Sequence, residues 1–129
     1  MARSATSLLL IFVSLFLALL HPAAAEQVVF SEIMYHPSGE LPEFIEVHNL
    51  TATPFDIAKW QLSGGVDFQV DDFNDSRPMA TFLKAFERVV FSSVDPATFR
   101  AAYGLPDAIR VFGPWQGNLR DDGERVSLK

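Results

Sequence analysis

The sequence contains no cysteine, few basic residues and, after residue 25, no long hydrophobic run. The absence of cysteine excludes disulfides, thiolate metal ligands and cysteine catalysis. A small domain without disulfides must be stabilised by burial of its apolar side chains. The 10 Lys and Arg residues are outnumbered by 16 Asp and Glu residues, which gives a formal net charge of −6. The basic residues are also scattered singly, so we expect no nucleic-acid partner, because binding to phosphates needs clustered positive charge.

The first 25 residues have the three-part pattern of a secretory signal peptide. Arg3 and the N-terminal amine are positive, residues 8–20 are almost all apolar, and Ala23-Ala24-Ala25 offers a small-residue cleavage site. The alternative is a membrane anchor, but such a run rises only about 20 Å as a helix, against about 30 Å of hydrocarbon. We therefore predict a signal peptide over residues 1–25 and a protein that is secreted, periplasmic or on the cell surface, with no membrane association after cleavage.

Residues 26–129 are enough for one small domain, and their apolar pattern is that of a β-protein. In Glu43–Asn49, Ile45 and Val47 alternate with polar or aromatic residues, as in a half-buried strand. The consecutive apolar residues Val89 to Phe91 predict a central strand. We expect eight short strands, at 27–34, 43–49, 55–57, 60–62, 66–70, 86–92, 109–112 and 125–128, the last introduced by an Asp122-Gly123 hairpin turn.

One short helix is predicted after the strand at 86–92. Asp95 can cap the first backbone N–H groups, Pro96 suits the first helical position, and Gly104 suits the C-terminal end. The helix body would then be Thr98–Tyr103. Many short strands and one helix predict an all-β class, an antiparallel β-sandwich with one short helix.

Four short motifs follow one another along residues 26–129. They are Ser31-Glu32-Ile33, Glu43-Phe44-Ile45-Glu46-Val47-His48-Asn49, Trp60-Gln61-Leu62 and Leu119-Arg120-Asp121-Asp122-Gly123-Glu124-Arg125-Val126-Ser127-Leu128. Together they resemble the lamin-tail domain, an immunoglobulin-like β-sandwich that is also found in secreted bacterial proteins. The acidic segment 71–84 departs from that pattern, because it is longer than the usual turn. The resemblance implies a non-enzymatic interaction or scaffold module that contacts a protein or cell-surface partner.

The resemblance also implies at least one further strand after Val126-Ser127-Leu128, for which the sequence has no residues. Either the sequence is a fragment, truncated at its C-terminal end, or the last strand comes from elsewhere, and we favour the fragment. The alternative function is an accessory domain of a larger exported enzyme, such as a spore-coat-type kinase or a hydrolase, whose catalytic part is absent here. This alternative is an analogy at the level of the fold.

Glu32, Glu46, His36 and His48 are the best candidates for a catalytic or zinc-binding group. If the first two strands pair antiparallel, Glu32 and Glu46 face each other, and His48 shares a face with Glu46. Paired carboxylates can act as acid and base, and Glu with His can hold zinc. No His-x-x-x-His or comparable spacing is present. We therefore interpret these residues as structural or surface groups and predict no catalytic residue and no cofactor.

A dense run of oxygen ligands offers a weaker candidate, a calcium site in an acidic loop. Calcium takes six to eight oxygens, but this run lacks the spacing of an EF-hand loop, and a solvated acidic surface explains it as well. The candidate ligands are Asp67, Asp71, Asp72, Asn74 and Asp75.

Two patterns remain. Asn49-Leu50-Thr51 and Asn74-Asp75-Ser76 match the N-glycosylation acceptor pattern, which a glycosylating host could use. Trp60 lies at a predicted strand position, and we expect it in the core.

Overall fold

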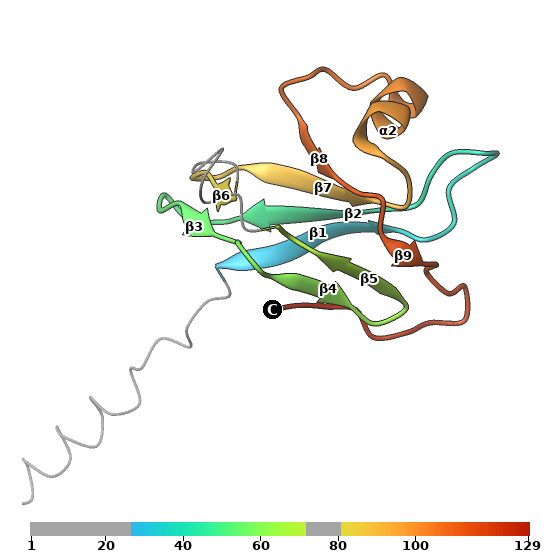
Figure 1. Cartoon of the computed structure of the whole chain (residues 1–129), viewed down its shortest axis with the longest axis horizontal. Coiled ribbons are helices and arrows are strands. Elements are labelled where there is room, and N and C mark those ends of the chain that lie inside the picture. Colours follow the sequence, from blue (N-terminus) through green and yellow to red (C-terminus); the bar gives the residue numbers. More distant parts are fainter. Residues whose placement is uncertain (1–26, 72–80) are drawn as a thin grey trace, which may run out of the picture.

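The structure is a computed structural model that describes residues 27–71 and 81–129. These residues form ten β-strands and one α-helix (Figure 1), which confirms the predicted all-β sandwich with one short helix. No helix in these two segments is long and apolar enough to cross a membrane. The predicted signal peptide over 1–25 and the acidic residues Asp72, Asn74 and Asp75 lie outside the described residues.

The first sheet contains four strands, in the spatial order β1 (Val28–Met34), β2 (Phe44–Asn49), β7 (Arg88–Ser92) and β8 (Arg110–Phe112). β1, β2 and β7 pair antiparallel, but β8 is parallel to β7. The prediction of a wholly antiparallel sandwich is therefore wrong at β8. After β7 the chain forms helix α2 (Pro96–Tyr103) and returns to begin β8 at the same end of the sheet, which makes the two strands parallel.

Burial in this sheet follows the sequence pattern. The predicted alternation in β2 is confirmed, because Ile45 and Val47 are buried while Phe44 and Glu46 occupy the other face. β7 is the predicted central strand, with β2 and β8 as neighbours and apolar contacts on both faces. Its consecutive apolar residues are needed because one face packs on the second sheet and the other on the helix.

Helix α2 covers the outer face of the first sheet (Figure 1). Its predicted end signals are confirmed. The Asp95 carboxylate accepts hydrogen bonds from the backbone N–H groups of Ala97 and Thr98, both at 3.1 Å, and Gly104 ends the helix at φ +64°. Phe99 is buried and packs against Phe44 of β2, with ring centroids 5.6 Å apart. The helix therefore buries a second, smaller apolar cluster.

The second sheet packs on the inner face of the first, and the main core lies between them. Its strands are, in spatial order, β10 (Ser127–Leu128), β4 (Gln61–Ser63), β5 (Val66–Gln69) and β9 (Gln116–Gly117). β4 and β5 form a hairpin whose turn contains Gly64 at φ +133°. A side chain at Gly64 would also collide with the backbone of Arg125, so this glycine lets β10 lie close to the hairpin.

The predicted hairpin at Asp122-Gly123 is wrong. A turn does occur there, with Gly123 at φ +92°, but β10 pairs with the distant β4, where Ser127 lies opposite Ser63. The segment before the turn is not a strand. Leu119 is buried in the main core, and its N–H donates to the Glu43 carboxylate at 3.1 Å. This contact leaves no strand before the turn for β10 to pair with.

A third, two-stranded sheet joins β3 (Phe55–Asp56) to β6 (Phe82–Leu83). The sequence did not predict β6 or β9, because a two-residue strand shows no alternation. The predicted strand at 125–128 is likewise shortened to the two residues of β10.

Candidate functional site

Glu32 and Glu46 face each other across β1 and β2, as predicted. Glu46 is held in place on the outer face of the first sheet. Its carboxylate accepts a hydrogen bond from the Ser31 hydroxyl at 2.7 Å and lies 3.2 Å from Nε of Arg88. These two contacts give the Glu46 carboxylate a structural role.

The two histidines do not complete a site around these glutamates. His48 lies on the outer face of β2, opposite Arg88 and Val29. His36 lies in the loop after β1, where its Nδ1 is 3.2 Å from the Asp121 carboxylate, and both side chains are exposed. In residues 27–71 and 81–129, no three His, Asp or Glu side chains come close enough together to hold a metal ion. Within the described residues, the structure therefore places Glu32 opposite Glu46 but brings no third metal-ligating side chain to the pair.

The calcium candidates are only partly described. Asp67 lies on β5, where its carboxylate accepts a hydrogen bond from Nε2 of Gln61 at 2.9 Å, and Asp71 is exposed just after that strand. The other three candidates lie outside the described residues. The calcium site therefore stays a prediction.

Asn49 has a structural role. Its side chain is fully buried, and its Nδ2 donates to the carbonyls of Thr53 and Lys84 at 2.8 and 2.9 Å. Its Oδ1 accepts from the N–H of Thr51. The amide thus ties the end of β2 to two neighbouring loops, and the folded chain does not present this acceptor for glycosylation. Asn74 lies outside the described residues.

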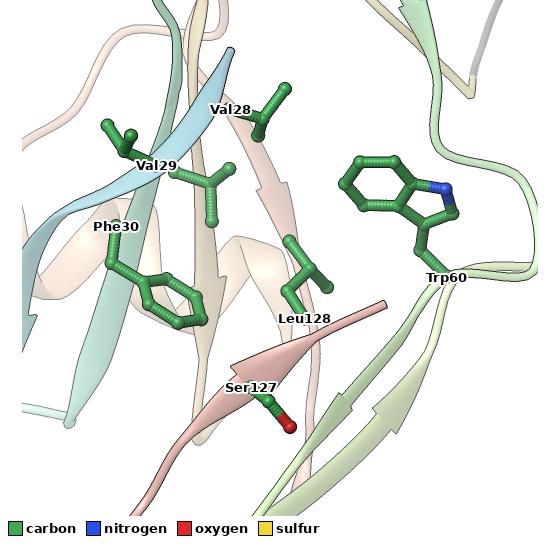
Figure 2. A pocket seen from close by; sticks show the side chains of 7 residues that line it. Val28, Val29, Phe30, Trp60, Ser127 and Leu128 are labelled. Carbon is green, nitrogen blue, oxygen red and sulfur yellow. The ribbon is translucent and has the colours of Figure 1, made fainter. Parts of the chain in front are cut away.

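A pocket lined mostly by apolar side chains separates the edge strands of the two sheets on one side of the sandwich. β1 is the outermost strand of the first sheet, and β10 is the outermost strand of the second. Figure 2 shows side chains of both strands around this pocket, with Trp60 beside Leu128. The pocket has a volume of about 250 Å³ and is lined by Val28, Val29, Phe30, Val47, Trp60, Ser127 and Leu128.

A second pocket continues along β1 and the loop that follows it. Its volume is about 280 Å³, and Ile33, Tyr35, Leu119 and Val126 contribute its apolar lining. Ile33 lies opposite Ile45, yet it is 42% exposed, whereas Ile45 is fully buried. The second sheet therefore leaves the inner face of β1 partly uncovered. We call the two pockets together, with Val28, Phe30, Ile33, Trp60, Val126 and Leu128 as their apolar lining, the open seam.

The edge of β1 that does not pair with β2 presents backbone N–H and C=O groups beside the open seam. The Leu50 N–H donates to the Gln27 carbonyl at 2.8 Å, so the backbone groups of Gln27 point toward β2. In an antiparallel ladder these groups alternate from residue to residue between the two sides of a strand. The N–H and C=O groups of Val28 and Phe30 therefore point away from β2, toward the open side.

Sequence reasoning missed the open seam. Trp60 was expected in the core, and it does pack against the main cluster, but it is only half-buried and forms a wall of the first pocket. No local pattern shows the open seam, because it depends on which neighbours β1 and β10 have in the two sheets.

A third pocket, of about 180 Å³, lies between α2 and the outer face of the first sheet. Phe44, Phe99 and Tyr103 line it, and Glu32 and Glu46 stand at its polar end. The Tyr103 hydroxyl donates to the Pro42 carbonyl at 2.8 Å. Burial raises the pKa of Tyr103, and the negative charge of Glu32 raises it further. The charge of Glu32 therefore acts on this outer face.

Comparison of the chain with models of protein families, with curated proteins and with solved structures found no match. Function is therefore inferred from the geometry of the open seam and from the sequence motifs.

Proposed function

We propose that this protein is an exported, non-enzymatic interaction module of the lamin-tail type, which binds an extended segment of a protein partner along the open seam. The observation that supports this proposal is the coincidence of an edge strand with exposed backbone groups and an apolar lining beside it. Edge strands of this kind pair readily with another chain. In such recognition, main-chain hydrogen bonds supply affinity and pockets for alternate side chains supply specificity.

β1 is the better of the two edges for this pairing. It has seven residues, whereas β10 has two. A partner strand beside β1 would bond the backbone groups of Val28 and Phe30. Every second side chain of that strand would point inward, toward Trp60 and Leu128, and would fill the first pocket. The partner would thus cover apolar surface that the two sheets leave exposed.

A bulge sets the length of regular pairing. The register of β1 on β2 shifts between Phe30 and Glu32, which places Ser31 as the extra residue. Bulges bend a strand and interrupt its ladder. We therefore expect the partner to pair regularly up to Phe30 and to contact the second pocket, near Ile33, through side chains.

The experiment is an NMR titration of protein expressed from the full 129-residue sequence. The probe is the neutral peptide acetyl-Thr-Val-Ser-Val-Ser-Val-Thr-amide, and the same peptide with N-methyl groups on its valines is the control, because it cannot donate along one edge. We expect saturable shifts at the amides of Val28 and Phe30 and at the Trp60 indole, with the methylated peptide weaker. Shifts confined to α2, or equal binding of both peptides, would contradict the proposal.

A matched pair of variants locates the contact. Val28→Pro removes an N–H that points to the open side, which an edge strand tolerates. Val29→Pro removes an N–H that points to β2 and should instead destabilise the fold. The proposal requires Val28→Pro to lose peptide binding while the protein stays folded.

A further inference from the structure

Glu32 and Glu46 form an unfavourable pair, because like charges directly opposite each other on two strands repel. Glu46 is compensated by Arg88 at 3.2 Å and by the Ser31 hydroxyl at 2.7 Å. In the part of the chain that the structure describes, no basic side chain lies within ion-pair distance of Glu32. Among the described residues, Glu32 therefore has no compensating cation of its own.

The position of Glu32 shows where a compensating charge could come from. β1 has β2 on one side and the open side on the other, so a strand added to β1 is the next neighbour of Glu32. The carboxylate is exposed on the outer face, at the polar end of the pocket lined by Phe44 and Tyr103. An outward-pointing residue of the added strand would lie beside it.

We propose that the segment bound along β1 is basic as well as apolar, with inward apolar residues over the open seam and an outward Lys or Arg that pairs with Glu32. This inference rests on the proposed function and names the chemistry of the partner. The net charge of −6 favours the same class of partner, because complementary charge raises the rate of association.

The raised pKa of Tyr103 agrees with this placement. The negative charge of Glu32 contributes to that rise, so its electrostatic field reaches the Tyr103 hydroxyl beside α2. A cation at Glu32 would weaken this effect and lower the pKa of Tyr103 toward its usual value. Peptide binding therefore has a spectroscopic signature at Tyr103.

The test compares three peptides, acetyl-Thr-Val-X-Val-X-Val-Thr-amide with X as Lys, Ser or Glu, titrated into protein expressed from the full sequence. At low ionic strength, we expect the Lys peptide to bind about threefold to fivefold more tightly than the Ser peptide, the range of an exposed ion pair. The Glu peptide should bind more weakly than the Ser peptide. Salt at about 0.5 M should remove most of the difference, because it screens exposed charges.

Glu32→Gln tests the contribution of the Glu32 charge, and Asp107→Asn is its matched control. Both are exposed carboxylates, and both substitutions change the net charge equally. We expect Glu32→Gln to bring the Lys peptide to the affinity of the Ser peptide, without changing the affinity for the Ser peptide itself. Asp107→Asn should keep the preference for Lys.

The outcomes separate this inference from the proposed function. Equal binding of the Lys and Ser peptides, with shifts at Val28 and Phe30, would overturn the basic partner and leave strand addition standing. A Lys preference that survives Glu32→Gln would also overturn it. Absence of binding by all three peptides at millimolar concentration would overturn both proposals.

Discussion

The two sides of the sandwich are built differently, although both are lined by apolar residues. On the side of β8 and β9, the chain itself crosses from one sheet to the other. Phe112 of β8 stacks on Phe91 with ring centroids 5.1 Å apart, and β9 follows four residues later. Trp115, in the crossing, is buried, and its backbone N–H donates to the Ser92 carbonyl at 3.1 Å. This closed side is thus covered by the connection between the sheets.

On the side of β1 and β10, two pockets separate the edge strands of the two sheets. The residues there have the same apolar character, but Ile33 is 42% exposed, while Trp115 in the crossing is 5% exposed. Periodicity decides which face of a strand turns inward, whereas the connection between strands decides whether that face is covered. The difference makes the open seam available to a partner.

The largest contrast between the two sides should appear when one aromatic side chain is removed from each. Phe91→Ala leaves a cavity in the main core, where Phe91 stacks on Phe112 of the closed side, and should cost about 3–5 kcal/mol of unfolding free energy. Phe30→Ala, at a half-buried residue on the open seam, should cost about 1–2 kcal/mol. Urea denaturation of both variants measures the difference. Equal losses would mean that the open side is packed as tightly as the closed side.

Ion pairs give the next contrast. Arg110 of β8 donates to both oxygens of Glu87, at 2.8 and 2.9 Å, and Glu87 also accepts from the Lys84 N–H at 2.6 Å. Because this pair is largely buried, Glu87→Gln should cost about 2 kcal/mol. Glu46→Gln, beside the more exposed Arg88, should cost less than about 1 kcal/mol. The same urea measurement checks both, and a reversed order would contradict the contrast.

Acid should weaken helix α2, on the outer face of the first sheet, through its cap. The Thr98 hydroxyl and the N–H groups of Thr98 and Ala97 lower the pKa of Asp95 below its usual 3.8. A lowered carboxyl pKa stabilises the fold above the unfolded value, and that contribution is lost as the pH falls through the folded value. Between about pH 6 and about pH 3, Asp95→Asn should therefore lose less stability than the wild type. An identical loss in both proteins would contradict this role.

The smallest effect concerns the outer face beside the open side. Glu32→Gln should lower the pKa of Tyr103, because the substitution removes the negative charge that helps to raise it, and burial alone should keep it above the usual value of 10.0. Absorbance of the tyrosinate during an alkaline titration measures this shift, with Asp107→Asn as the control. An unchanged pKa in Glu32→Gln would place the carboxylate too far from Tyr103 to act on it.

Local signals predicted part of this fold well. Asp95, Pro96 and Gly104 set the ends of α2 through the backbone groups next to them, so sequence alone was enough. The alternation in β2 and the apolar run in β7 also determined their burial. Pairing was harder to predict. The parallel β8 and the partner of β10 depend on where distant segments pack, and no local pattern records that.

The same limit applies to the candidate site. The sequence drew attention to Glu32 and Glu46, and the antiparallel register brought them together. His36 was a candidate for the same group, but the loop after β1 places it beside Asp121. The open seam could not be seen in the pattern, because Val28 and Phe30 look like core residues until the neighbours of β1 are known.

Hydrogen exchange at β1 tests the central proposal most directly. The amides of Val28 and Phe30 point to the open side, so they should exchange quickly in the protein alone, while the Val29 amide, which points to β2, exchanges slowly. Addition of the Lys peptide should slow exchange at Val28 and Phe30 and leave Val29 unchanged. If Val28 and Phe30 exchange at the same rate with and without saturating peptide, the open seam is not the site of strand addition.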